Sequence, residues 1–222
     1  MTTNESLFFR DKSPFEQFRD VVMPALIQSR PASRRIRIWC AAASTGQEPY
    51  TVAIILKEMA RELRNWRVEI LATDLSTEVL EKAKSGIYSQ FEVQRGLPVT
   101  LLIKYFSQVG EMWQIAPELR AMVQFKPLNL LRDFSSLGTF DVVFCRNVLI
   151  YFDQDTKIDV LQRLAKVVDA GGYLALGAAE TVVGLVDAFK PMAERRGFYV
   201  PSQGQGGSSK IIQLKPRVAA SA

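Results

Sequence analysis

The feature that most constrains the fold is the stretch of residues 36–63, in which an apolar run is followed by small residues and then by a helical pattern. Residues 36–43 are mostly apolar, include β-branched and aromatic side chains and are too few for a helix, so they predict a buried strand. Gly46 then permits a tight turn and a close approach of the backbone to a ligand. Thr45 and Glu48 have the spacing of a capping box at a helix start. This helix is expected to bury an apolar stripe formed by Val52, Ile55, Leu56, Met59 and Leu63.

The residues around this turn indicate what kind of ligand it holds. A strand, a small-residue turn and a helix N-terminus are typical of the first crossover of an open α/β sheet, where such folds bind ligands. The phosphate-binding patterns G-x-x-x-x-G-K-[ST] and G-x-G-x-x-G are absent, and Glu48 would repel a pyrophosphate at the helix N-terminus. Asp74 follows the next apolar run, where an acidic residue of a nucleotide-binding α/β fold binds ribose hydroxyls. S-adenosylmethionine (AdoMet), with its ammonium and sulfonium, fits these two carboxylates better than NAD, but a purely structural turn with a solvated Glu48 remains open.

The composition describes a globular domain without a membrane span. The 222 residues suit one domain with a large core, and 48% hydrophobic with 23% charged residues is typical of soluble proteins. Because no apolar run approaches ~20 residues and no signal-peptide pattern is present, we expect no direct membrane insertion. Cys40 and Cys145 both lie in apolar runs, which favours buried thiols in a reducing cytoplasm.

Charge and side-chain chemistry exclude several classes of function. Lys210, Lys215 and Arg217, in a tail without acidic residues, contribute three of the five net positive charges. The rest of the chain is therefore too weakly basic to indicate nucleic-acid binding. The chain has no histidine, so the usual general base is missing, and there is no pattern of metal ligands around the cysteines.

The order of the predicted elements divides the chain into three parts. Residues 1–35 form an arm and a helix that begins at Pro14 and packs on the ligand site. Residues 36–200 form the α/β domain, with 87–126 as a small antiparallel insertion that contains a helix at 97–105 and strands at 112–115 and 122–125. Residues 201–222 are rich in glycine, serine and glutamine and predict a flexible tail. The remaining pattern predicts a helix capped by Ser76 and ended by Gly86, a strand at 140–145, a helix at 154–168, a strand at 173–176 and an edge strand at 198–200.

Five stretches carry a resemblance to one family. They are Thr-Asn-Glu-Ser-Leu-Phe-Phe-Arg-Asp at 3–11, Ala-Ala-Ala-Ser-Thr-Gly-Gln-Glu-Pro-Tyr at 41–50, Ala-Thr-Asp-Leu at 72–75, Asn-Leu at 129–130, and Phe-Cys-Arg-Asn-Val-Leu-Ile-Tyr-Phe-Asp at 144–153. In order and spacing they resemble the CheR-type chemotaxis protein-glutamate O-methyltransferases over about residues 2–200.

The resemblance implies a fold, a reaction and a partner. The expected fold is a doubly wound AdoMet-dependent methyltransferase (Rossmann-like) sheet with a small antiparallel β insertion. The expected reaction is methyl transfer from AdoMet to glutamate side chains of chemoreceptors, giving glutamyl methyl esters and S-adenosyl-L-homocysteine. The implied partner is the cytoplasmic helical region of methyl-accepting chemoreceptors, and we expect a cytoplasmic monomer. The alternative function is an AdoMet-binding regulatory or adaptor module without transfer activity.

The resemblance also assigns roles to individual residues. The cofactor-binding residues it implies are Asn4, Ser6, Arg10, Glu48, Asp74, Asn129, Leu130, Arg146 and Asn147. Arg10 and Tyr151 would orient the acceptor carboxylate as the catalytic residues. Local alternatives are that Asn129 caps a turn and that Arg146 and Asn147 bind carbonyls at a strand end. Tyr151 has the further alternative of a core position.

Three features depart from the family's usual pattern. Ser6 stands where threonine is common, which keeps the hydroxyl. The helical domain that precedes the arm in full-length members is missing, so we expect either a minimal member or a truncated chain. The turn around Gly110 is shorter than in members that bind a receptor's C-terminal peptide, so we expect no such tethering.

Overall fold

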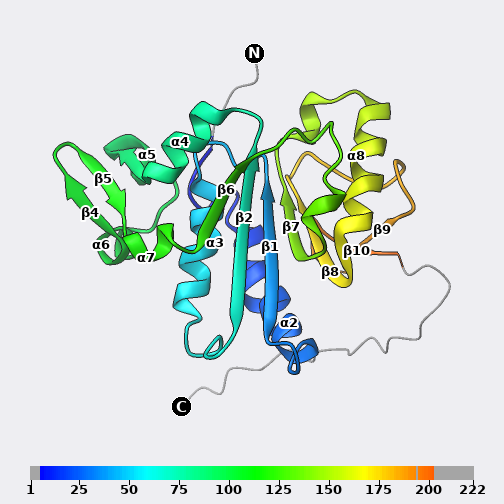
Figure 1. Ribbon diagram of the computed structural model, residues 1–222, viewed down its shortest axis with the longest axis horizontal. Helices are drawn as coiled ribbons and strands as arrows, with labels where there is room; N and C mark the ends of the chain where they lie inside the picture. The colour runs from blue at the N-terminus through cyan, green and yellow to red at the C-terminus, as the bar shows by residue number, and fades with distance from the viewer. Residues whose placement is uncertain (1–5, 194, 203–222) are drawn as a thin grey trace.

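A seven-stranded sheet forms the centre of the computed structural model, which describes residues 6–193 and 195–202. Its strands lie in the order β6 (Val123–Pro127), β2 (Arg67–Asp74), β1 (Arg35–Ala41), β7 (Phe140–Cys145), β8 (Val168–Leu176), β10 (Phe198–Pro201) and β9 (Phe189–Pro191) (Figure 1). The strands from β6 to β8 are parallel, and β10 is antiparallel to both of its neighbours. The chain reverses its direction across the sheet between β1 and β7, which is the doubly wound arrangement that was predicted.

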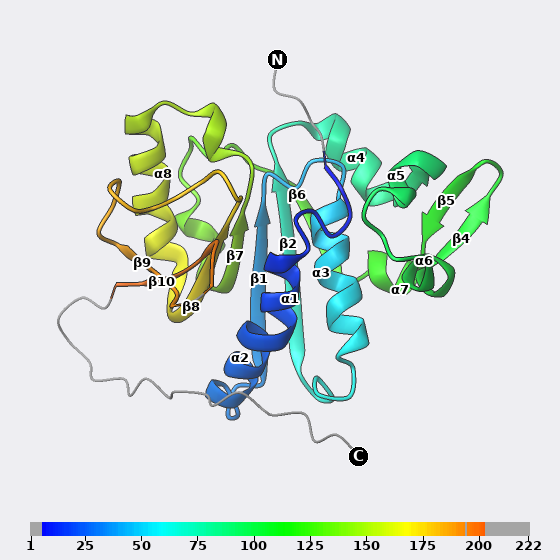
Figure 2. The ribbon, with the colours of Figure 1, turned by 180° about the vertical axis from the view of Figure 1, so that it is seen from behind.

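Helices cover both faces of this sheet, as Figures 1 and 2 show. One face carries α1 (Ser13–Gln17), α2 (Met23–Ser29) and α3 (Gln47–Glu58), with a π-helical turn, η1 (Phe18–Val22), joining the first two. The other face carries α8 (Gln154–Val167). α4 (Thr77–Ser85) packs against β2 and β6 next to α3, where Tyr50 Oη of α3 donates to the Ala83 carbonyl of α4 at 2.7 Å. Ser76 caps α4 by accepting from the Val79 amide, and Gly86 ends it in a left-handed conformation, so both predicted signals are confirmed.

Side chains of β1 alternate between two hydrophobic cores. Ile36, Ile38 and Cys40 pack towards the face of α1, α2 and α3, whereas Trp39 and Ala41 pack in the core on the side of α8. Burial on both faces explains why this strand reads as a nearly continuous apolar run.

The insertion is a three-stranded antiparallel sheet with short helices around it. Its elements are β3 (Ile87–Ser89), α5 (Gln90–Gln94), α6 (Val99–Tyr105), β4 (Phe106–Val109), β5 (Met112–Ile115) and α7 (Pro117–Arg120). A short turn at Gly110 joins β4 to β5. The strand predicted at 122–125 does not belong to this sheet, because β6 pairs in parallel with β2 at the edge of the central sheet. Val123 is the only buried residue of β6, so the periodicity of this strand carried no signal for which sheet it joins.

Three other local predictions are wrong. No capping box forms, because Gly46 is the N-cap of α3 with φ 95° and Thr45 Oγ1 donates instead to Gln47 Oε1 at 2.8 Å. The helix ends at Glu58, so Met59, which is its C-cap, and Leu63 lie outside it. The edge strand is β9 rather than β10, which lies between β8 and β9. Two short turns complete the described elements, η2 (Ser135–Leu137) and η3 (Leu149–Tyr151), and the predicted tail lies outside the described residues from 203 onwards.

Candidate active site

A cavity of about 250 Å³ opens where the strand order reverses. Its walls come from the segments that follow the carboxyl ends of four neighbouring parallel strands, together with the N-terminal arm. These segments are residues 42–44 after β1, 74–75 at the end of β2, 128–131 after β6 and 146–148 after β7. Ligands of open α/β sheets bind at such a switch point. The described residues predicted for the site all line this one cavity: Ser6, Arg10, Glu48, Asp74, Asn129, Leu130, Arg146, Asn147 and Tyr151. Asn4 lies outside the described residues.

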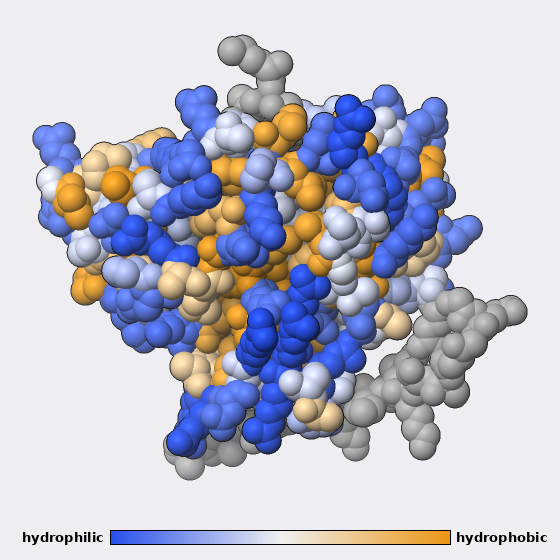
Figure 3. All heavy atoms as spheres, viewed as in Figure 1, coloured by the Kyte–Doolittle hydropathy of each residue, from blue (hydrophilic) through white to orange (hydrophobic). Residues whose placement is uncertain are grey.

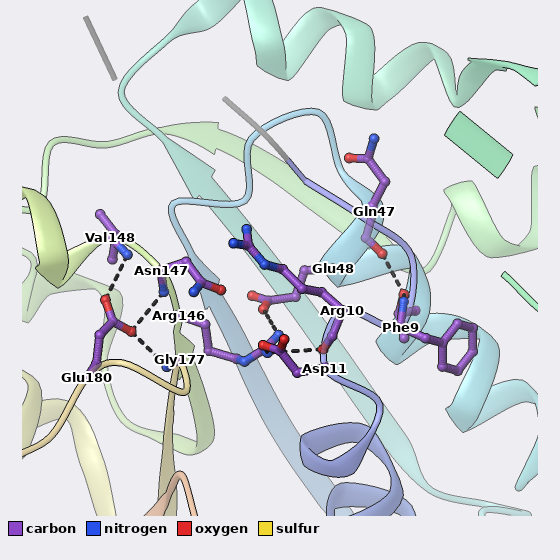
Figure 4. Close-up of polar contacts among 11 residues, drawn as sticks. Phe9, Arg10, Asp11, Gln47, Glu48, Arg146, Asn147, Val148, Gly177 and Glu180 are labelled. Carbon is purple, nitrogen blue, oxygen red and sulfur yellow. Dashed lines mark hydrogen bonds and ion pairs between the residues drawn. The ribbon is translucent and has the colours of Figure 1, made fainter. Parts of the chain in front are cut away.

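Arg146 ties the arm to the sheet beneath the cavity (Figure 4). Its guanidinium donates from Nη1 to Glu48 Oε2 at 3.1 Å, and from Nη2 to Asp11 Oδ2 at 2.8 Å and to the carbonyl of Arg10 at 3.1 Å. The Arg146 side chain is 1% exposed and lies 5.1 Å from the centre of the Phe15 ring. One cation therefore binds a carboxylate of α3, a carboxylate of the arm and an arm carbonyl, and this carbonyl is not at a strand end, where the local alternative had placed the contact.

Burial raises the pKa of the Glu48 carboxyl above its ordinary value. The charges of Arg146 and Arg10 oppose that rise, whereas Glu180 adds to it. The carboxyl is 13% exposed and faces the cavity with one oxygen held by Arg146. A cationic ligand in the cavity would favour the ionised form, because an opposite charge nearby lowers the pKa of a carboxyl.

Asp74 stands at the end of β2 and fixes the turn after β1. Its Oδ2 accepts from the Ser44 amide at 2.8 Å and its Oδ1 from the Ser76 amide at 3.0 Å. Ser44 adopts a left-handed conformation with φ 50°. Each carboxylate oxygen keeps further acceptor capacity for a hydroxyl of a ligand. The close approach at Gly46 is not to the cavity, since a Cβ there would lie 2.9 Å from Ala83 Cβ.

The loop after β6 supplies an apolar wall. Asn129 Oδ1 accepts from the Leu131 amide at 2.9 Å, so Asn129 does form the turn that was the local alternative, and it also lines the cavity. Leu130 is buried, and the apolar wall includes Leu75, Leu128, Leu130, Leu131, Val148 and Phe152.

The arm is anchored beside the cavity by an aromatic side chain. Phe8 is fully buried and packs edge-on against Tyr88 at 5.1 Å and Phe106 at 5.6 Å, measured between ring centres. The Phe9 amide donates to Thr51 Oγ1 at 3.1 Å, which connects the arm to α3. Gly96 leaves space for the Phe8 carbonyl, because a Cβ there would lie 2.1 Å from that oxygen. These contacts hold Ser6 and Arg10 at the cavity.

The segment after β7 carries Asn147 and Tyr151. Asn147 has φ 58°, and η3 follows it with Tyr151 46% exposed at the rim, so Tyr151 is not a core residue. The carboxylate of Glu180 accepts from the amides of this segment. Glu180 was not predicted, although it follows three small residues after the carboxyl end of β8, at the same edge of the sheet where Asp74 ends β2.

This set of groups fits AdoMet. The Glu48 carboxylate carries the negative charge that a cationic ligand needs, the Asp74 carboxylate has acceptor capacity for ligand hydroxyls, and the apolar wall suits a flat ring. An acidic side chain in the first turn of α3 disfavours a phosphate there.

Comparisons with known proteins agree with this interpretation. The model of the family described as CheR methyltransferase, SAM binding domain, matches residues 4–198. The chain is 43% identical over 194 residues to chemotaxis protein methyltransferase Cher2 of Pseudomonas putida, covering 86% of this chain and 70% of that protein. It is 45% identical over 195 residues to chemotaxis protein methyltransferase 1 of Pseudomonas aeruginosa, with the same coverage. The crystal structure of the DszA carbon methyltransferase is similar in fold alone, with a TM-score of 0.50, 22% identity and coverage of 81% of this chain and 40% of that chain.

The fold and the site define an AdoMet-dependent methyltransferase. The match along almost the whole described chain shows more than this class: the chain belongs to the CheR methyltransferase family. Its cofactor is AdoMet, and its activity is methyl transfer in chemotaxis. None of the helices in the described ranges has the length and apolar character needed to cross a membrane.

Proposed function

We propose that this protein methylates glutamate side chains in the cytoplasmic helical region of chemoreceptors and forms glutamyl methyl esters. The observation that carries the proposal is the presence of Arg10 and Tyr151 on the same cavity as the residues suited to AdoMet. An arginine fork and a phenolic hydroxyl can together orient a carboxylate. The names of the relatives as chemotaxis protein methyltransferases support the choice of partner.

The proposed roles divide the cavity between cofactor and acceptor. Glu48 binds the methionine portion, Asp74 the ribose, and Asn129 with Leu130 the adenine surroundings. Asn4 and Ser6 cover the cofactor from the arm, which Arg146 holds through Asp11 and the Arg10 carbonyl. Asn147 lines the same cavity, and its proposed place is where cofactor and acceptor meet.

The reaction needs alignment rather than a base. When bound, AdoMet supplies an electrophilic methyl group on its sulfonium. A glutamate carboxylate is ionised near neutral pH, so a chain without histidine can provide all that the acceptor requires. Arg10 and Tyr151 orient the carboxylate, and the enclosing arm excludes water as opposite charges cancel. A grip on the carboxylate that is too tight would stabilise the ground state and slow the transfer.

The surface around the cavity suits a weakly bound protein partner. Leu75 is 69%, Leu131 51% and Ile150 44% exposed near the mouth. Figure 3 shows further hydrophobic surface gathered between the insertion and α8, with hydrophilic residues around it. We expect the insertion and this mouth to dock on receptor helices that carry acidic side chains. Because this chain is net positive, salt screens the attraction between the two proteins, so methylation should fall as salt rises. With its short turn at Gly110, the insertion should not bind a receptor C-terminal pentapeptide.

The decisive experiment is radiolabelled-methyl transfer to a chemoreceptor cytoplasmic fragment, with AdoMet binding measured in parallel by isothermal titration. The label should be released by mild alkali as methanol, which is diagnostic of a methyl ester. A fragment whose methylation-site glutamates are all replaced by glutamine is the control and should stay unlabelled. AdoMet binding without transfer would instead support a regulatory module.

A further inference from the structure

Five backbone amides converge on one buried carboxylate next to the cavity. Glu180 is 8% exposed. Its Oε1 accepts from the amides of Val148 at 2.9 Å, Leu149 at 2.7 Å and Ile150 at 3.3 Å. Its Oε2 accepts from the amides of Asn147 at 2.8 Å and Gly177 at 2.7 Å. Figure 4 shows Glu180 on the far side of this segment from Arg146, with bonds to Asn147, Val148 and Gly177.

This carboxylate fixes the conformation of the segment after β7. Successive amides of an extended chain point to opposite sides, so four in a row can face one acceptor only if the chain turns tightly around it. Asn147 makes that turn with a left-handed φ of 58°, a conformation that non-glycine residues rarely adopt. The segment then leads directly into η3, which ends at Tyr151 on the cavity rim.

Gly177 is shaped to the same cluster. A Cβ at Gly177 would lie 2.8 Å from Glu180 Oε2, 2.8 Å from Asn147 Nδ2 and 2.9 Å from the Asn147 amide nitrogen. Because two of these atoms belong to Asn147, a side chain at Gly177 would push the segment and the carboxylate apart. Two residues after β8 are thus matched to the conformation of the segment after β7.

We propose that Glu180 is a positioning residue for methyl transfer: its carboxylate holds residues 147–150 so that Asn147 and Tyr151 face the cavity in their productive geometry. Glu180 itself does not line the cavity. The proposal rests on the roles proposed above for Asn147 and Tyr151. An amide in place of the carboxylate presents an N–H₂ group to at least two of the five amide donors, whichever way it is turned, and so releases the segment.

The test compares Glu180→Gln and Gly177→Ala with Asp169→Asn in the full chain. Asp169 is the matched control, because its carboxylate also accepts a backbone amide, that of Gly171 at 3.0 Å, but lies outside the cavity lining. In folded Glu180→Gln and Gly177→Ala, kcat should fall about 10–100-fold, the scale at which a displacement of about 1 Å slows catalysis. Asp169→Asn should keep the wild-type kcat. Amide hydrogen exchange at 147–150 should become faster in the two test variants alone.

A double variant separates positioning from a general loss of stability. If Glu180 acts through Tyr151, then Glu180→Gln combined with Tyr151→Phe should lose little more activity than the worse single variant. Multiplying effects, or a folded Glu180→Gln with kcat within twofold of wild type, would overturn the proposal. Gly177→Ala decides the matter in the same way if Glu180→Gln does not fold. Failure of the wild-type protein to methylate any receptor glutamate would count against the proposed function. The hydrogen-exchange comparison at residues 147–150 needs no receptor, so unchanged exchange in folded Glu180→Gln would count against the positioning role alone.

Discussion

Replacing Arg146 by methionine removes a buried cation and leaves its buried partner in place. Methionine keeps most of the apolar stem over Phe15 but cannot bind Glu48, whose side chain is 13% exposed. Asp11 is 40% exposed, so the loss of its pair matters little, about 0–1 kcal/mol. The main cost is therefore the unpaired carboxyl of Glu48.

The size of that cost is limited by protonation. Breaking a buried ion pair by removing one partner costs about 3–5 kcal/mol. Glu48 can avoid an unpaired negative charge by taking up a proton, which at pH 7 costs about 3.7 kcal/mol for a carboxyl with an unfolded pKa of about 4.3. We expect Arg146→Met to lower the free energy of unfolding by about 3–4 kcal/mol at pH 7. Above about pH 4.3, unfolding of the variant releases this proton, so the variant becomes more stable as pH falls. The loss of unfolding free energy relative to wild type should therefore shrink by up to about 1.4 kcal/mol per pH unit towards pH 5.

Urea unfolding followed by circular dichroism at pH 5, 6 and 7 measures these losses. Arg163→Met is the matched control: Arg163 also lies over an aromatic ring, that of Phe134 at 5.0 Å, and pairs with Asp159 at 2.6 Å. Asp159 is 63% exposed, so this variant should lose less than about 1 kcal/mol at every pH. A loss below about 1 kcal/mol for Arg146→Met at pH 7, or a loss that does not change with pH, would refute the reasoning.

Three further predictions concern the cavity and the arm. Burial raises the pKa of Glu48 and a cationic ligand lowers it, so AdoMet binding should release protons and should tighten as pH rises through that pKa. Isothermal titration in two buffers of different ionisation enthalpy measures the proton release. The absence of proton release would place Glu48 away from the ligand. Asp74→Ala should weaken AdoMet binding by roughly 1–3 kcal/mol, and unchanged affinity in a folded variant would remove Asp74 from the site. Gly96→Ala should cost about 1–3 kcal/mol, because φ is 90° there and the new Cβ meets the Phe8 carbonyl. Proteolysis of the arm should become faster in that variant, and an unaltered cleavage rate would contradict its anchoring at Gly96.

The local elements followed from short-range patterns in the sequence. The cap at Ser76 and the left-handed end at Gly86 depend on residues within one helical turn, and both were predicted. Glu48 and Asp74 were placed at one sheet edge because Glu48 opens the helix after one predicted strand and Asp74 ends the next. Such positions need only the strand ends, which apolar runs reveal.

The partners of the buried charges were decided by the tertiary structure alone. Arg146 and Glu48 are 98 residues apart, and Glu180 is 32 residues from Val148, whose amide it accepts. No periodicity links residues at such separations, and a carboxylate that binds amides leaves no matching side chain in the sequence to reveal its role. The capping pattern of Thr45 and Glu48 was wrong because Gly46 is the N-cap of α3, and the Glu48 carboxylate accepts from Arg146 across the fold. The position of β6 at the edge of the central sheet was decided in the same way, because β6 has only one buried residue and its place beside β2 comes from backbone pairing across the fold.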